Sequence, residues 1–134
     1  MRPHLLLDTH AVVRWLVEPR RLTRDQARAL REAVRNRQPV GIGGISLLEI
    51  ALLEGLDRKR LPAPPRELLA EIDRNPVFQI LPISVEVAME VATLGPRLRD
   101  PADRAIVATA RVHALRLVTS DQRIIDSGLV PVVA

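Results

Sequence analysis

The chain has 134 residues and a formal net charge of +4; 47% of its residues are hydrophobic and none is cysteine. This length suits one domain with a continuous core over residues 1–134, and the missing cysteines exclude disulfide scaffolds, thiolate zinc sites and cysteine nucleophiles. No apolar run approaches the roughly 20 residues that span a bilayer, and an aspartate interrupts the apolar N-terminus too early for a signal peptide, so we expect a cytoplasmic protein without membrane contact.

The first half of the chain alternates strands with helices. A short apolar strand, His4–Leu7, ends at Asp8, and a helix with apolar residues at helical spacing follows as far as Pro19. A second helix is predicted over 23–37, with Thr23 as its N-cap. The glycine-rich segment Gly41–Gly44 is expected to be a flexible strand-to-helix turn. Around it we expect a weak strand over 39–42, a helix over 46–56, a surface loop over 57–65 and a short helix over 67–74.

The second half repeats this alternation and predicts the fold class. Strands are expected over 77–81, 115–119 and 130–133, the last at an edge, and helices over 85–94, 101–114 and 122–127. Strands that alternate with helices form a parallel sheet covered on both faces, with ligands at the carboxyl ends of the strands. We therefore expect an α/β fold whose chemistry lies at that edge.

Acidic residues occur where strands give way to helices or where helices begin. They are Asp8 after Leu-Leu-Leu, Glu49 three residues after Ser46, Asp103 opening an apolar helix, and Asp121 after Leu-Val-Thr-Ser. If these carboxylates converge, their mutual repulsion raises some pKa values unless a cation neutralises them. Oxygen ligands without cysteine favour Mg²⁺ or Mn²⁺ over zinc.

Two of these positions also have a purely structural explanation. Ser46 and Glu49 have the spacing of a capping box, with Ser46 as the N-cap. Asp100 has the features of an N-cap as well, followed by proline at N1 and by Asp103 at N3, where the helix dipole favours an acid. Asp8 and Asp121 are harder to explain in this way, because each follows an apolar strand.

The ordered segments resemble the motifs of the PIN-domain family, and the nearest likeness is to the VapC-type ribonuclease toxins of bacterial toxin–antitoxin pairs. The segments that carry the resemblance are Leu7–His10, Ile45–Ile50, Asp100–Ala110 and Val118–Asp121. The resemblance implies a three-layer α/β/α sandwich with a central parallel sheet. It also implies endonucleolytic cleavage of RNA that depends on Mg²⁺ or Mn²⁺.

The resemblance assigns roles to particular residues of this chain. The catalytic residues and metal ligands that it implies are Asp8, Glu49, Asp103 and Asp121. Asp100 matches an additional acid of the toxin subgroup. It is either a further metal ligand or only a helix cap. The polar companions, which either support the acids or serve as caps and turn formers, are Thr9, Ser46 and Thr119.

Charge and chemistry agree with a nucleic-acid substrate. One or two hard cations would hold a scissile phosphate and activate a water molecule, so no protein nucleophile is needed. The basic residues are arginines apart from Lys59, and arginine pairs well with phosphates, although an arginine-rich surface can also be merely solvated. Arg104, beside Asp103, is expected to contact phosphate or to form a salt bridge with a neighbouring acid.

The resemblance also implies three partners: an RNA substrate, a second copy of the chain in a homodimer, and a cognate antitoxin at the acidic crevice. The apolar residues of 11–16 and 47–56 are candidates for protein contacts or for core packing, and the loop 57–65 is a candidate contact with RNA or antitoxin. The alternative is a catalytically silent PIN-like module that binds RNA or protein. The presence of all four motif acids argues against that alternative.

Overall fold

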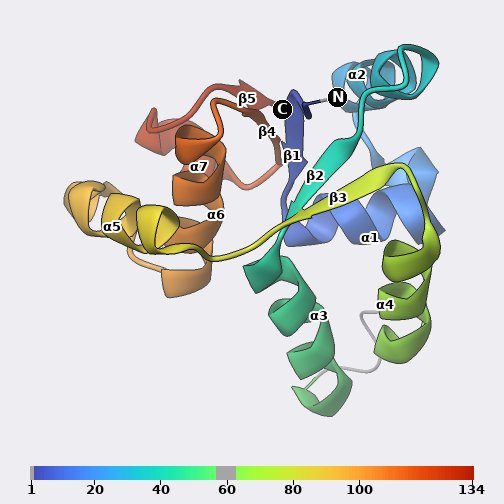
Figure 1. Cartoon of the computed structure of the whole chain (residues 1–134), viewed down its shortest axis with the longest axis horizontal. Coiled ribbons are helices and arrows are strands. Elements are labelled where there is room, and N and C mark those ends of the chain that lie inside the picture. The colour runs from blue at the N-terminus through green and yellow to red at the C-terminus, as the bar shows by residue number, and fades with distance from the viewer. Residues whose placement is uncertain (1, 57–62) are drawn as a thin grey trace.

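The computed structural model describes residues 2–56 and 63–134, and it shows a twisted sheet between two layers of helices (Figure 1). The sheet has the order β3-β2-β1-β4-β5, and every pair of neighbouring strands is parallel. This arrangement confirms the predicted α/β/α sandwich. The strands are β1 (Leu5–Leu7), β2 (Val40–Gly43), β3 (Phe78–Leu81), β4 (Arg116–Val118) and β5 (Val132–Val133).

The helices follow the predicted order, with ends that differ by a few residues. Within the described residues, none of them has the length and apolar character that crossing a bilayer requires. Two short 3₁₀ turns, Pro19–Arg21 and Gly95–Arg97, join helices. The helices are α1 (Thr9–Val17), α2 (Arg24–Arg35), α3 (Gly44–Leu56), α4 (Pro65–Arg74), α5 (Val85–Thr93), α6 (Pro101–Val112) and α7 (Gln122–Ser127).

The core lies on both faces of the sheet because successive strand residues point in opposite directions. In β1, Leu5 and Leu7 pack against α1, α2, α3 and α4, whereas Leu6 packs against α5, α6 and α7. Figure 1 shows the same division, with α5, α6 and α7 on one side of the strands and α1 on the other. All three leucines are buried, so β1 is the central strand of a sheet covered on both sides.

Helix α3 begins at Gly44, two residues earlier than predicted, and the flexible glycine turn is absent. Ser46 therefore lies inside the helix, and the prediction that it is an N-cap is wrong. Gly41 belongs to strand β2, where a Cβ atom would lie 3.1 Å from the carbonyl oxygen of Leu5 and 3.1 Å from a methyl of Leu81. The glycine thus permits close packing within the sheet.

The parallel strands all end at one edge of the sheet, which places the acidic motifs together. Leu7 of β1 pairs with Val118 of β4, so the residues that follow them, Asp8 and Thr119, are neighbours. Residues 57–62 of the predicted contact loop 57–65 lie outside the described residues. Helix α4 begins at Pro65.

Candidate metal centre

Asp8 joins the end of β1 to the first turn of α1. Its Oδ1 accepts a hydrogen bond from the Ala11 amide at 2.8 Å and so caps the helix. Its Oδ2 accepts a hydrogen bond from the Thr119 hydroxyl at 2.5 Å. Burial raises the pKa of Asp8, while the hydrogen bonds from Thr119 and Ala11 act in the opposite direction. Asp8 is therefore a buried carboxyl whose two oxygens are held in place by neighbouring elements.

Thr9 connects this strand end to α3. Its hydroxyl donates to Glu49 Oε1 at 2.6 Å, and its Oγ1 forms a second hydrogen bond, of 2.9 Å, with Ser46 Oγ. Thr9 and Ser46 are buried and Glu49 is half-buried. The early start of α3 thus turns Ser46 from a predicted cap into part of a polar network that orients Glu49.

Asp103 projects from the first turn of α6 into the same region. Asp100 is the N-cap of this helix, as predicted, and its Oδ1 accepts hydrogen bonds from the amides of Ala102 and Asp103 at 2.8 and 3.1 Å. Burial raises the pKa of Asp103 to about 6, with further contributions from the charges of Asp100, Asp121 and Glu49. Asp103 Oδ2 is buried and has no hydrogen-bond partner among the described residues. This oxygen makes no hydrogen bond within that part of the chain, and the nearest guanidinium nitrogen there, Arg123 Nη2, lies 3.6 Å away, so a metal ion could coordinate it.

Asp121 follows β4 and caps α7, with Oδ1 accepting from the Arg123 amide at 2.9 Å. The Arg123 guanidinium also lies on this carboxylate: Nη2 is 3.1 Å from Oδ2 and Nε is 3.3 Å from Oδ1. The same Nη2 lies 3.6 Å from Asp103 Oδ2. The Arg123 side chain, through its hydrogen bonds and charge, lowers the pKa of Asp121. Arg123 therefore bridges two of the predicted metal ligands.

The acids meet at one edge of the sheet, but their present rotamers do not form a closed metal site. In residues 2–56 and 63–134, no group of three or more acidic or histidine side chains is arranged to hold an ion as the side chains stand. Asp8 is linked through Thr119 to the Asp121 amide, which donates to Thr119 Oγ1 at 3.0 Å. Glu49 and Asp121 are close enough to Asp103 to raise its pKa.

The residues at this edge fit a hard divalent cation. The donors are carboxylate oxygens, the ligand type that Mg²⁺ and Mn²⁺ prefer. Among the described residues Asp103 Oδ2 accepts no hydrogen bond, and this absence and the raised pKa of Asp103 both indicate an excess of buried negative charge. Arg123 offsets part of that charge from the solvent side, where its side chain is 72% exposed.

Two residues that the sequence analysis did not single out hold this site together. Arg123 lies in the first turn of α7, where the helix dipole disfavours a basic residue, and that mismatch was a usable signal. Gln26 of α2 is 1% exposed, and its Nε2 donates to Ser120 Oγ at 3.0 Å and to the Val133 carbonyl at 3.3 Å. The capping box of Gln26 with Thr23 was visible in the sequence, but the contact with Ser120 required the fold.

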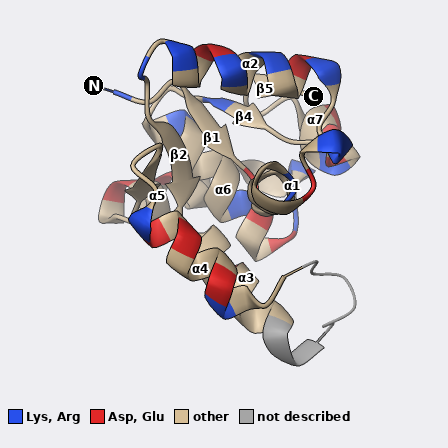
Figure 2. Ribbon diagram, turned by 90° about the vertical axis from the view of Figure 1, so that its right-hand side faces the viewer, with Lys and Arg blue, Asp and Glu red and all other residues tan. Residues whose placement is uncertain are grey.

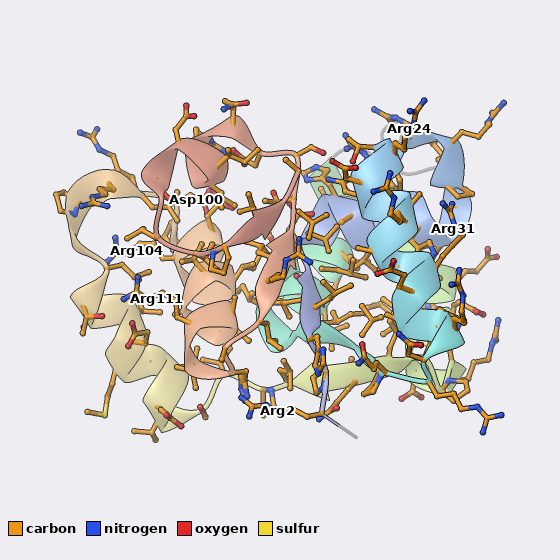
Figure 3. The ribbon with its side chains drawn as sticks, turned by 90° about the horizontal axis from the view of Figure 1, so that it is seen from above. Arg2, Arg24, Arg31, Asp100, Arg104 and Arg111 are labelled. Atoms are coloured by element: carbon orange, nitrogen blue, oxygen red, sulfur yellow. The ribbon has the colours of Figure 1, made fainter. Side chains whose placement is uncertain are left out.

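Arg104 forms no salt bridge with an acid in the described part of the chain, and that expectation is wrong. Its guanidinium donates to the carbonyls of Gly95 and Leu98, both at 2.6 Å, and to that of Val91 at 2.7 Å. In Figure 3 it lies beside α6, between Asp100 and Arg111. Arg104 thus fixes the α5–α6 connection by satisfying carbonyls at a helix end.

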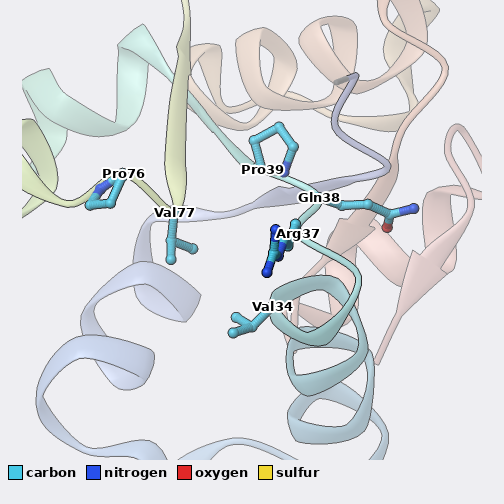
Figure 4. A pocket seen from close by; sticks show the side chains of 6 residues that line it. All are labelled: Val34, Arg37, Gln38, Pro39, Pro76 and Val77. Carbon is cyan, nitrogen blue, oxygen red and sulfur yellow. The ribbon is translucent and has the colours of Figure 1, made fainter.

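A separate shallow pocket of about 310 Å³ lies between the end of α2 and the segments that lead into β2 and β3 (Figure 4). Its lining contains one charged residue, Arg37, and no acid. A pocket of this composition provides neither metal ligands nor a general base. The chemistry is therefore assigned to the acidic edge. The lining residues are Val34, Arg37, Gln38, Pro39, Pro76 and Val77.

Comparisons with known proteins agree with this fold. The family model "PIN domain" matches residues 5–127. Ribonuclease VapC22 of Mycobacterium tuberculosis is 33% identical over 121 residues, which cover 90% of this chain and 88% of that protein.

Solved structures share the architecture over nearly the whole chain. FitAcB from Neisseria gonorrhoeae is 25% identical with a TM-score of 0.67, covering 97% of this chain and 96% of that one. DNA-bound VapBC from Salmonella typhimurium is 14% identical with a TM-score of 0.70, again covering 97% and 96%, and supports the fold alone. The chain therefore belongs to the PIN-domain family, among its VapC-type members.

Proposed function

We propose that this protein is a divalent-metal-dependent endoribonuclease that acts as the toxin of a toxin–antitoxin pair. The observation that carries the proposal is the meeting of Asp8, Glu49, Asp103 and Asp121 at one sheet edge, where the buried Asp103 Oδ2 has no hydrogen-bond partner among the described residues. A relative 33% identical is named a ribonuclease, and this supports RNA as the substrate.

The four carboxylates would hold one or two Mg²⁺ or Mn²⁺ ions. When bound, the metal supplies positive charge that favours attack of water on a phosphodiester and stabilises the leaving oxygen. Asp100 Oδ1 already accepts two amide hydrogen bonds, so only its Oδ2 is available to coordinate a metal ion. No side-chain nucleophile is required for this hydrolysis.

The neighbouring hydroxyl groups orient the ligands. Thr119 donates to Asp8 and lowers the pKa of that buried carboxyl against the effect of burial. Thr9 donates to Glu49 and links it to Ser46. Such contacts behind the metal ligands typically contribute 10- to 100-fold in metal affinity or activity.

Arg123 is expected to oppose metal binding, because its guanidinium already lies on Asp121 and near Asp103. Replacing Arg123 by Gln should tighten Mn²⁺ binding about 5- to 10-fold, since a cation must no longer displace a nearby positive charge. Isothermal titration calorimetry measures this change, and Arg123→Lys, which keeps the charge, is the matched control. Equal or weaker Mn²⁺ binding by the Gln variant would contradict the assignment of Arg123 to the ion's surroundings.

The function itself is tested with purified, antitoxin-free protein and a mixed pool of cellular RNA. Discrete fragments that form with Mg²⁺ or Mn²⁺, and that disappear in EDTA, are the expected result. RNA that is bound but remains uncut under all metal conditions would instead identify a catalytically silent binding module.

The proposal includes a second copy of the chain and an antitoxin that covers the acidic edge. On α1, Ala11 and Val12 are buried in the core, whereas Val13, Trp15 and Leu16 are half-buried and pack against it. On α3, Leu48 and Leu52 are 53% and 57% exposed and lie one turn apart, and we assign them to the homodimer interface.

Light scattering should give a dimer for the wild type and a monomer for Leu52→Glu. A monomeric wild type would exclude this interface.

A further inference from the structure

Helix α2 presents a stripe of arginines to solvent. Arg24, Arg28, Arg31 and Arg35 follow one another at intervals of four, three and four residues, and all are exposed. At 100° per residue, these positions fall within roughly 60° of one another around the helix, and they extend over about 16 Å of its length. Figure 2 shows basic segments recurring along α2. We call these four residues the arginine stripe.

The arginine stripe lies on the side of α2 opposite to the core. Gln26, Leu30 and Ala33 form the buried side of the helix, whereas the outward side is flanked by Asp25 and Glu32. The large apolar side chain exposed on α2, Val34, lies about 60° around the helix from Arg31, so the outward surface itself consists of guanidinium groups. A phosphodiester backbone requires only properly spaced guanidinium groups. The chemistry of this surface therefore favours a nucleic-acid strand over an acidic protein.

The arginine stripe starts beside the acidic edge. The hydroxyl of Thr23, the N-cap of α2, donates to the Ala134 carbonyl at 3.0 Å, and Gln26 Nε2 donates to Ser120 Oγ at 3.0 Å. Ser120 directly precedes Asp121. In Figure 3, Arg24 lies near one end of α2 and Arg31 lies farther along the helix. An RNA strand that leaves the acidic edge on this side thus meets Arg24 first.

We propose that the arginine stripe of α2 is a second RNA-binding surface, which holds the sugar-phosphate backbone of the substrate next to the cleaved bond. This inference rests on the proposed ribonuclease function and adds to it a path for the strand. The contacts are to phosphates and carry no base readout. The stripe therefore strengthens binding of long substrates and leaves the choice of the cleaved bond to the acidic edge.

The test removes two charges from the stripe with Arg24→Gln/Arg31→Gln and compares them with two charges removed from α4 with Arg66→Gln/Arg74→Gln. Glutamine keeps helix propensity close to that of arginine. Binding of a fluorescent 20-nucleotide single-stranded RNA is followed by anisotropy between 50 and 200 mM salt, with Asp103→Asn present in every protein to prevent cleavage. Two lost phosphate contacts should reduce the slope of log K against log[salt] by about 1.4 and weaken binding about 10- to 30-fold at 0.1 M salt.

The control pair on α4 should change neither the slope nor the affinity. The proposal is overturned if the stripe variant and the control variant bind RNA with equal affinity. If the stripe variant keeps its RNA affinity but no longer binds an acidic protein partner, the surface belongs to that partner. Cleavage by otherwise wild-type protein separates this result from the parent hypothesis. The stripe variant should cut a four-nucleotide RNA at the wild-type rate, while its KM for the 20-nucleotide RNA rises about tenfold. A wild type that cuts neither RNA would contradict the nuclease assignment. In that case the anisotropy measurement still tests whether the stripe binds RNA.

Discussion

Replacing Asp103 by Asn is expected to reduce RNA cleavage at least 100-fold while making the folded protein more stable. The variant loses a carboxylate that the cation site needs, and a metal ligand contributes at least as much as the 10- to 100-fold of the groups behind it. It also removes a carboxylate that burial and three neighbouring acids disfavour more than the Arg123 guanidinium, 3.6 Å away, favours it. Loss of activity together with a gain in stability distinguishes a functional acid from one that supports the fold.

The stability gain should depend on pH in a defined direction. The pKa of Asp103 is raised from 3.8 to about 6 by burial and by neighbouring carboxylates. The carboxyl of Asp103 therefore loses its proton at lower pH in the unfolded chain than in the folded protein. As a result, the free energy of unfolding falls as pH rises from about 4 to 6. The loss is on the order of 1 kcal/mol after allowance for partial solvent screening.

Urea denaturation in EDTA at a series of pH values measures this effect. Asp103→Asn should show a smaller fall in stability between about pH 4 and 6 than the wild type, because only the contribution of Asp103 is removed and that of Asp8 remains. The exposed control Asp73→Asn on α4 should retain both the wild-type fall and full cleavage activity. An Asp103→Asn protein that is less stable than the wild type at pH 7.5, or that still cleaves RNA, would show that Asp103 serves the fold instead.

Thr119→Val is expected to have the second large effect, because this buried hydroxyl serves two acids. Valine cannot donate to Asp8 Oδ2 or accept from the Asp121 amide, and both groups lose a hydrogen bond. Leaving them unsatisfied should lower the free energy of unfolding by about 2 kcal/mol. Cleavage should fall about 10- to 100-fold.

A positioning role for Thr119 predicts a change in the pH profile as well as in rate. The Thr119 hydrogen bond lowers the pKa of Asp8, so its loss should move the acid limb of the cleavage profile to higher pH. Thr119→Ser should restore the profile. Thr109→Val, which removes another buried hydroxyl whose hydrogen bond within the described residues goes to the Ala105 carbonyl of its own helix, should leave it unchanged. Identical acid limbs in the wild type and Thr119→Val would rule out the role.

Much of the fold could be predicted from local patterns. The apolar runs before Asp8 and Asp121 are buried strands, because the alternation of short apolar strands with amphipathic helices has one stable solution, a covered parallel sheet. The helix start at Asp100 was also predictable, since an N-cap followed by proline at N1 is a strong local signal.

The remaining features depend on contacts between segments that are distant in sequence. Ser46 has the spacing of an N-cap, yet α3 starts earlier, and its hydroxyl bonds to Thr9. Arg104 is adjacent to Asp103 but points to three carbonyls at the α5–α6 connection. Arg123 contacts Asp103 only because α7 and α6 meet at the sheet edge. Sequence patterns give helix and strand limits, but they do not give the direction of a long polar side chain.

Anomalous diffraction from a crystal grown with Mn²⁺ tests the central claim most directly, because it locates the ion without reference to activity. The account predicts a peak at coordination distance from Asp103 Oδ2 and from carboxylates of Asp8, Glu49 or Asp121, with Arg123 moved away from Asp103. A peak elsewhere, or Mn²⁺ at saturating concentration with no peak at this edge, would contradict the assignment of the four acids to a metal centre.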